Sequence, residues 1–265
     1  MRICSWAGLA ATVWALAPLP RAAADEFDRV ALYEKGLKST VYIVIPVKDK
    51  HRAGSGSLID AEQRLVVTCA HVVGDAEAAF CQFPIRNKDG SLMTEKKKYL
   101  DRVDAGLALK GKVLHRDAKR DLALVKLDKL PTDTPALPLA KESVRVGEKV
   151  INIGNPDKVE QTFSTTDGKV RGVEVVDFVV VGSDGATRMK CKAKMVKITN
   201  PMAVADVGGP WVDKRGYQIA VANSAYFDAA SQNVNGAIDV TEVRSFLADH
   251  KIKLPEPKVD EGPKK

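Results

Sequence analysis

The sequence predicts an all-β fold in which two β-barrel lobes are followed by one short helix. Short runs rich in β-branched and aromatic residues recur along the chain, and glycine, proline, asparagine and aspartate separate them. A proline-rich stretch at residues 130–138 divides these runs into two halves. Apolar residues recur at helical spacing at residues 240–250. Many short strands with frequent turn signals are typical of a pair of barrels.

The first half contains six predicted strands. The glycine-rich residues 54–59 and the apolar residues 65–68 are expected to form a hairpin. Residues 87–98 are polar and contain Asp89-Gly90, so we expect a loop there. The remaining strands are predicted at residues 40–46, 78–83, 111–115 and 122–127. Together these runs form a first lobe at about residues 40–130.

The second half also contains six predicted strands, at residues 149–153, 163–171, 173–181, 189–198, 218–224 and 236–239. Ser183-Asp184-Gly185 supplies a hairpin turn. With the helix, these strands form a second lobe at about residues 139–250. The charged, proline-containing residues 251–265 predict a disordered tail.

The first 24 residues have the features of a secretory signal peptide. Met1-Arg2 gives a positive start, residues 3–19 are apolar, and Ala22-Ala23-Ala24 provides an Ala-x-Ala cleavage site. The apolar run is short for a membrane span and is broken by prolines. We therefore expect residues 1–24 to be removed, leaving a lead-in at residues 25–39 and an exported protein, periplasmic or extracellular, with no stable membrane span. The alternative is a retained N-terminal anchor.

Composition argues against several functions. Removal of Arg2 and Arg21 with the leader lowers the formal net charge from +7 to +5, and 34 acidic residues are interspersed with the basic ones. The densest basic run, Lys96-Lys97-Lys98, lies in the predicted polar loop without aromatic interleaving, so we expect no nucleic-acid partner. The sequence has no Walker loop and no zinc-ligand spacing, so we predict no cofactor and no metal.

Three cysteines remain after removal of the leader, and an odd count leaves at least one unpaired in an oxidising compartment. Cys69 and Cys81 lie on either side of His71, so one interpretation is a disulfide between them. The other is that Cys69, Cys81 and Cys191 are all small buried apolar residues. The sequence does not decide between the two.

Five short motifs follow one another along the chain. They are Gly-Ser-Gly-Ser-Leu-Ile-Asp at 54–60, Leu-Val-Val-Thr-Cys-Ala-His-Val-Val at 65–73, Asp-Leu-Ala-Leu-Val-Lys-Leu at 121–127, Ile-Gly-Asn-Pro at 153–156 and Ala-Asp-Val-Gly-Gly-Pro at 205–210. The second motif places His71 after an apolar strand, and the third places Asp121 at the start of another. Asp117 is the competing carboxylate, but no apolar strand follows it directly.

In this order the motifs resemble those of trypsin-like serine proteases of the HtrA/Deg type, over about residues 40–247. The resemblance implies a chymotrypsin-like double β-barrel. It implies that His71 is the general base and that Asp121 orients it. It also implies that residues 205–210 correspond to the nucleophile loop, which reads Gly-(Asp or Asn)-Ser-Gly-Gly-Pro in the family.

The nucleophile position of this loop holds Val207, which has no group that can attack a carbonyl. Ala205 stands where the family has glycine, and its Cβ resists the φ > 0 conformations that are open to glycine. The family's oxyanion hole uses backbone N–H groups of this loop, here the region of Ala205, Asp206 and Val207. Residues 200–205 also lengthen the approach to the loop. The resemblance therefore implies a protease fold without its serine and with an altered oxyanion hole.

Two alternatives remain open. The first is an active serine endopeptidase with a nucleophile elsewhere. Nearby hydroxyls are those of Thr199, Tyr217 and Ser224, but none has a Gly-x-Ser-Gly-like context, and Cys191 would require a different triad. The second alternative is an inert structural relic.

The interpretation we favour is a pseudoprotease that binds without cleaving. The strand edge at residues 223–227 is expected to pair with an extended peptide or an unfolded protein segment, since such pairing needs only main-chain donors and acceptors. Regulation of an active protease is a second binding role that we expect for such a protein.

Overall fold

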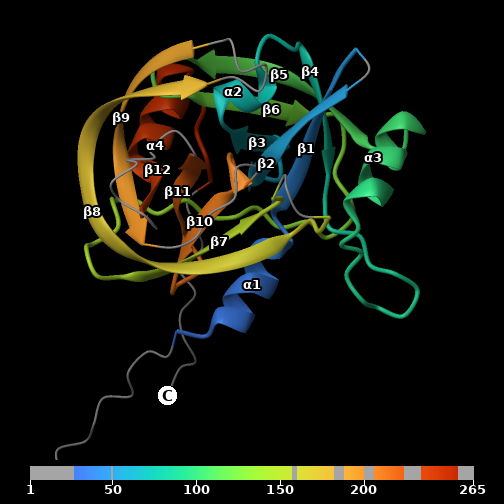
Figure 1. Cartoon of the computed structure of the whole chain (residues 1–265), viewed down its shortest axis with the longest axis horizontal. Helices are drawn as coiled ribbons and strands as arrows, with labels where there is room; N and C mark the ends of the chain where they lie inside the picture. Colours follow the sequence, from blue (N-terminus) through green and yellow to red (C-terminus); the bar gives the residue numbers. More distant parts are fainter. Residues whose placement is uncertain are drawn as a thin grey trace, which may run out of the picture.

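The computed structural model describes residues 27–48, 50–156, 160–181, 188–199, 206–223 and 234–255. These residues form two closed antiparallel barrels of six strands each, side by side (Figure 1). The prediction of an all-β double barrel is therefore confirmed. The predicted signal peptide, the turn at residues 183–185 and Ala205 lie outside the described residues.

The first barrel has the strand order β1-β2-β3-β6-β5-β4. Its strands are β1 (Thr40–Val47), β2 (Lys50–Asp60), β3 (Leu65–Thr68), β4 (Ala78–Gln82), β5 (Leu109–Asp117) and β6 (Leu122–Leu127). A one-turn helix, α2 (Ala70–Val73), follows β3 directly. Because β3 pairs with β6, the end of β3 lies beside the start of β6.

The second barrel has the order β10-β11-β12-β9-β8-β7. Its strands are β7 (Lys149–Gly154), β8 (Ser164–Val181), β9 (Arg188–Thr199), β10 (Pro210–Asp213), β11 (Gln218–Asn223) and β12 (Val234–Asp239). The two strands predicted at residues 163–171 and 173–181 form the single long strand β8, which Figure 1 shows curving along one side of the molecule. A bulge between Val170 and Gly172 lets β8 bend without ending.

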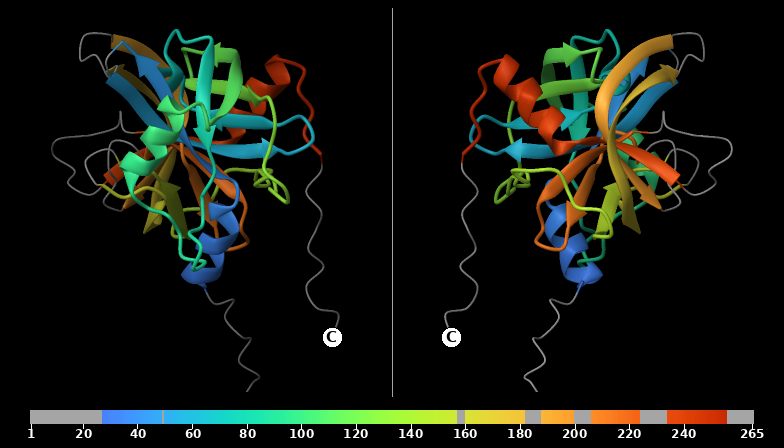
Figure 2. Two further views of the ribbon diagram at one scale, coloured as in Figure 1. Left: turned by 90° about the vertical axis from the view of Figure 1, so that its right-hand side faces the viewer. Right: turned by 90° about the vertical axis from the view of Figure 1, so that its left-hand side faces the viewer.

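The predicted helix near the end of the chain is α4 (Val240–Asp249), and Asp239 caps it by accepting a hydrogen bond from the Thr241 N–H at 2.9 Å. The short helix α2 and two longer helices had not been predicted. α1 (Arg29–Leu37) follows the cap residue Asp28, and α3 (Lys96–Asp104) replaces the end of the loop predicted at residues 87–98. Figure 2 shows α1 and α4 on different sides of the barrels.

The loop prediction was wrong at Lys96-Lys97-Lys98 because the helix is polar on most of its surface. Only Tyr99 and Val103, four residues apart, are buried in this helix. Two apolar positions are too few to show the helical spacing of apolar residues in the sequence. Lys97 pairs with Asp101 at 2.7 Å, one helical turn away. The basic run therefore begins a surface helix.

The tail prediction was also wrong at its start. Ile252 and Leu254 pack against the core, and the Ile252 N–H donates to Leu247 O at 2.9 Å. Apolar side chains at alternate positions thus attach residues 251–255 to the first lobe and α4. The rest of the predicted tail, residues 256–265, lies outside the described residues.

One apolar core runs through both barrels and α4. A second cluster lies beneath α1 and α3, where Tyr99 makes edge contacts with Tyr42 and Phe163 at centroid distances of 6.2 and 5.4 Å. Among the residues of the described ranges, no helix combines the length and apolar character that crossing a bilayer requires.

Candidate functional site

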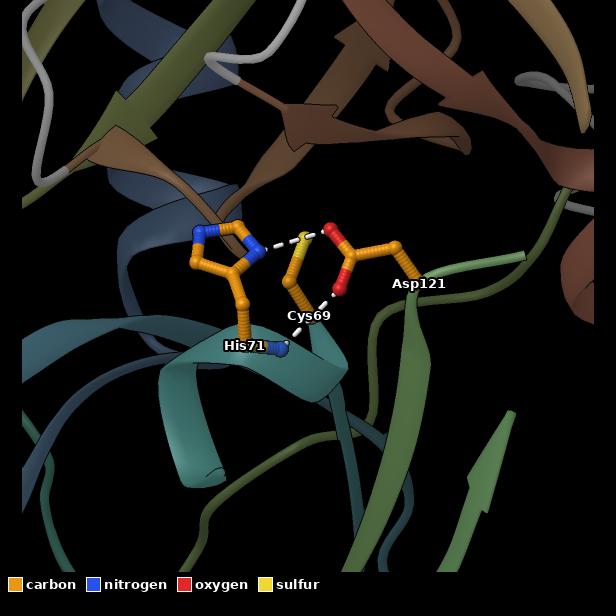
Figure 3. A group of neighbouring side chains, drawn as sticks. All are labelled: Cys69, His71 and Asp121. Atoms are coloured by element: carbon orange, nitrogen blue, oxygen red, sulfur yellow. Dashed lines mark hydrogen bonds and ion pairs between the residues drawn. The ribbon is translucent and has the colours of Figure 1, made fainter. Parts of the chain in front are cut away.

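The site lies where the first barrel meets the second. α2 places His71 just beyond the end of β3, and Asp121 directly precedes β6. The His71 Nδ1 lies 2.7 Å from Asp121 Oδ2, and the His71 backbone N–H donates to Asp121 Oδ1 at 3.0 Å (Figure 3). The structure therefore brings together the two residues that the sequence motifs paired.

Asp121 is held by more than the histidine. It is fully buried, and Asn223 at the end of β11 donates its amide N–H to Asp121 Oδ2 at 2.8 Å. Its backbone is left-handed, with φ 57°, a conformation that aspartate tolerates better than most residues. A buried carboxylate with three donors can orient an imidazole and stabilise its charged form.

The competing carboxylate has a different role. Asp117 accepts hydrogen bonds from the backbone N–H groups of Lys119 and Arg120 at 2.9 Å and pairs with the Arg120 side chain at 2.6 Å. It thus stabilises the turn between β5 and β6.

Asn223 was not predicted as a partner of Asp121. The sequence identified it only as the start of a peptide-pairing edge, of which residues 224–227 lie outside the described residues. In the sequence, Asn223 stands out only as a polar residue at the end of an apolar run. This pattern does not indicate that its partner is Asp121, which lies 102 residues earlier in the chain.

Cys69 completes a compact group with this pair. Its thiol donates to Ala222 O at 3.3 Å, and one ligand atom each from Cys69, His71 and Asp121 lies within 4.8 Å of the others (Figure 3). Burial and, next in size, the negative charge of Asp121 raise the pKa of the Cys69 thiol well above its usual value. The thiol is therefore protonated at neutral pH.

The disulfide interpretation of Cys69 and Cys81 is not supported by the structure, in which both are free and buried, as is Cys191. Cys69 lies at the end of β3 with its thiol directed to Ala222 in the second barrel. Cys81 lies on β4, which pairs with β1 and β5 and not with β3. Burial raises the pKa of Cys81 and of Cys191 to about 12.

The loop with the sequence Asp-Val-Gly-Gly is anchored between the barrels. The carbonyl of Val207 accepts from the Ser55 N–H at 2.8 Å, and the Gly208 N–H donates to Ala222 O at 2.8 Å. Gly208 has φ 85°, and a Cβ there would collide with the Ser55 carbonyl and the Thr68 hydroxyl. The loop thus lies against β2 and against the residues that lead into His71.

Val207 is almost completely buried at this position, with 2% of its surface exposed. Asp206 is buried as well. Its main chain packs closely on Gly154, and a Cβ added to Gly154 would lie 2.8 Å from the Asp206 Cα. Ala205 lies outside the described residues, so the first residue of the predicted oxyanion-hole region is not placed.

Two of the motifs serve to join the lobes. The Ser55 hydroxyl accepts from both the backbone N–H and the side-chain amide of Asn155 at 3.0 Å. Thr68 donates its hydroxyl to the Ser55 carbonyl at 2.7 Å. The glycine-rich strand and the Ile-Gly-Asn-Pro turn thus fix the second lobe against the strand that leads to His71.

Of the hydroxyls considered as replacement nucleophiles, that of Tyr217 is distant from this pair. Tyr217 precedes β11 while Asn223 ends it, so the two residues are six positions apart, roughly 20 Å along an extended strand. A cavity of about 540 Å³ beside Tyr217 is accordingly distant from His71. Thr199 ends β9, where it pairs with Lys169 and Val234. Ser224 lies outside the described residues.

Comparison with known proteins agrees with this geometry. A family model described as a trypsin-like peptidase domain matches residues 54–221, more than half of the chain. The serine protease HTR4 of Rattus norvegicus is 29% identical over 206 residues, which are 75% of this chain and 34% of that protein. The serine protease HTRA1A of Danio rerio is 26% identical over 210 residues, or 76% and 35% of the two chains. The chain thus spans about a third of the length of these relatives.

Solved structures share the fold. The active form of the Rv3671c protease from M. tuberculosis has a TM-score of 0.64 and 22% identity, over 92% of this chain and 97% of that one. A serine endoprotease from Yersinia pestis has a TM-score of 0.57 and 18% identity, over 83% and 65% of the two chains. The barrels, the ordered motifs and the family match lead to one conclusion: the chain belongs to the trypsin-like peptidase family, with HtrA proteins among its relatives.

Proposed function

We propose that this protein is an exported, HtrA-type protease homologue that binds polypeptide without cleaving it by serine catalysis. The observation that carries the proposal is Val207. It is buried, it is followed by Gly208-Gly209-Pro210 as the family's serine is, and its loop is tied to the strands beside His71 and Asp121.

The missing group removes the first chemical step. A serine protease needs a hydroxyl that attacks the carbonyl while a histidine takes its proton. His71 and Asp121 retain the geometry of base and orienter, but a valine side chain offers neither a proton nor a lone pair. The described cysteines are not replacements, because burial keeps all three thiols protonated at neutral pH.

The proposed binding activity depends on the strand edge predicted at residues 223–227, of which the structure describes only Asn223. Loss of a nucleophile leaves main-chain donors and acceptors unchanged, and these suffice to add an extended strand to a sheet. The His71 side chain is 15% exposed, so part of its ring is accessible to solvent. A polypeptide in extended conformation is therefore the ligand class that we propose.

Fluorescein-labelled, unfolded casein tests this proposal with the purified wild-type chain. We expect casein anisotropy to rise with protein concentration and to remain high over hours, and casein to stay intact on a gel. An active protease would instead lower the anisotropy with time as fragments form. If casein anisotropy did not rise at any protein concentration, the binding role would be contradicted. The alternative of an inert structural relic would then be favoured.

Export is proposed from the leader alone. Mass spectrometry of protein from the periplasmic or extracellular fraction should give an N-terminus at Asp25. An intact Met1 terminus in the membrane fraction would establish a retained anchor instead.

A further inference from the structure

We propose that Cys69, His71 and Asp121 form a binding site for a single zinc ion or a similar thiolate-preferring divalent cation. This inference does not depend on the proposed function. It starts from the compactness of the group, since Cys69 Sγ, a His71 ring nitrogen and an Asp121 carboxylate oxygen all lie within 4.8 Å of one another.

The ligand types suit zinc. Thiolate, imidazole and carboxylate bind Zn²⁺ at about 2.0–2.3 Å, and three protein ligands with one open position are typical of non-structural zinc sites. Figure 3 shows the Cys69 sulfur behind the contact between the His71 ring and the Asp121 carboxylate. Only small side-chain movements are needed for a metal to take the place of the proton that His71 Nδ1 and Asp121 Oδ2 now share at 2.7 Å.

The charges balance. Binding releases one net proton, that of the Cys69 thiol, which leaves to solvent. The proton between His71 Nδ1 and Asp121 Oδ2 is also lost from that position, and Nε2 takes up one proton, so the imidazole stays neutral with its proton on Nε2. Thiolate and carboxylate then carry two negative charges against the two positive charges of the ion. A neutral buried group avoids the large cost of an uncompensated buried charge.

The outer contacts are already in place. The His71 backbone N–H holds Asp121 Oδ1, and the Asn223 amide holds Asp121 Oδ2 at 2.8 Å. Such partners orient a ligand carboxylate, and their loss typically weakens metal affinity by about 10–100-fold. This proposal departs from the sequence-based prediction of no metal, which was made because a Cys-x-His pair and an aspartate 50 residues away match no common zinc spacing.

Cobalt(II) provides the test, because a thiolate ligand gives a sulfur-to-cobalt charge-transfer band that oxygen and nitrogen ligands do not. Co²⁺ is added to the full chain both in the folded state and during refolding, so that slow entry does not hide binding. We expect one equivalent and a sulfur band in the wild type. The Cys81→Ala variant, which removes a buried thiol elsewhere in the same barrel, should behave like the wild type.

The Cys69→Ala variant should lose the band, and Asn223→Ala should bind about 10–100-fold more weakly. Zinc should raise the melting temperature of the wild type and of Cys81→Ala, but not of Cys69→Ala. Circular dichroism establishes that each variant is folded. The proposal is overturned if the wild type shows no sulfur band in either arm, or if Cys69→Ala keeps the band. Neither outcome bears on the binding or cleavage of casein, so the proposed function is tested separately.

Discussion

Asp121 is the residue on which the site is built. It combines full burial, a left-handed backbone and three hydrogen bonds, from His71 twice and from Asn223 once. Each property alone is uncommon, and the three together fix a carboxylate at one position and orientation. This explains how the His71 ring is held in position.

Replacing Asp121 should therefore destabilise the protein in a graded way. Asp121→Ala leaves the N–H groups that donate to Asp121 without an acceptor. Alanine also adopts the left-handed conformation less readily than aspartate. The variant should therefore lower the free energy of unfolding by about 2–4 kcal/mol. Asp121→Asn keeps an oxygen acceptor and tolerates φ > 0, so it should cost less. Urea unfolding followed by circular dichroism measures both. Equal losses in the two variants would contradict the proposed contributions of the oxygen acceptor and of the left-handed backbone.

The buried thiols give a second prediction at this scale. In a Cys4→Ser variant at pH about 8, near the ordinary cysteine pKa of about 8.5, Ellman's reagent should titrate almost no thiol in the native protein, because burial raises the pKa values of Cys69, Cys81 and Cys191. After unfolding it should titrate three. A count of one would establish a disulfide.

At the scale of elements, Arg120 connects the turn before Asp121 to helix α4. Its guanidinium pairs with Asp117 at 2.6 Å, with Asp249 at 2.9 Å and with Glu242 at 3.0 Å. Glu242 also accepts from the Lys194 N–H of β9 at 2.8 Å. The helix is thus joined to both barrels at the point where Asp121 is presented.

Arg120→Ala should lower the free energy of unfolding by about 1–3 kcal/mol. This value lies between those typical of exposed and of buried salt bridges, because the Arg120 side chain is 24% exposed. Arg145→Ala is the matched control, since Arg145 is 86% exposed and pairs only with the nearby Glu148 among the contacts described. Its loss should cost less than about 1 kcal/mol. Equal effects in thermal melts would show that the Arg120 network is not specifically stabilising.

Which elements the sequence could predict follows from their side-chain periodicity. β3 and β6 are continuous apolar runs, and α4 has four buried apolar residues on one face, so all three were predicted within a residue or so. α3 was missed because two buried residues do not establish a period. His71 and Asp121 were predicted because motifs in known order surround them. Asn223 and the position of Cys69 depend on contacts across the whole chain, which no local pattern records.

At the scale of the whole molecule, both lobes contribute to the site. The first supplies Cys69, His71 and Asp121, and the second supplies Asn223 and the Val207 loop, while Ser55 and Asn155 join them. The site exists only when the barrels are docked. Conditions that separate or loosen the lobes should therefore disturb it.

Acid is one such condition. His115 on β5 stacks on His250 just after α4, with ring centroids 3.8 Å apart. Burial and, secondly, the neighbouring His250 lower the pKa of His115. The unfolded chain then binds more protons than the folded chain as the pH falls through the ordinary histidine value of about 6.5, so stability present above that pH is lost below it.

The melting temperature of the wild type should consequently fall between about pH 7.5 and about pH 5.5, the interval around that histidine value. His115→Phe retains a ring but cannot be protonated, so its decline should be smaller. His51→Gln, which alters a histidine paired with Asp104 elsewhere, leaves the stacked pair intact and serves as control. Identical pH profiles for His115→Phe and the wild type would contradict the assignment.

The central claim is that a trypsin-like fold has been retained here without serine catalysis, and covalent labelling with a fluorophosphonate tests it most directly. The purified wild type, Val207→Ser, and Val207→Ser combined with Ala205→Gly and a shortened 200–205 segment are each incubated with the probe and analysed by mass spectrometry. We predict no label on the wild type and little on Val207→Ser, because we expect the oxyanion hole to be altered as well. We predict substantial label only on the combined variant. Strong labelling of Val207→Ser alone would show that the oxyanion hole is intact. Labelling of any serine in the wild type would contradict the account.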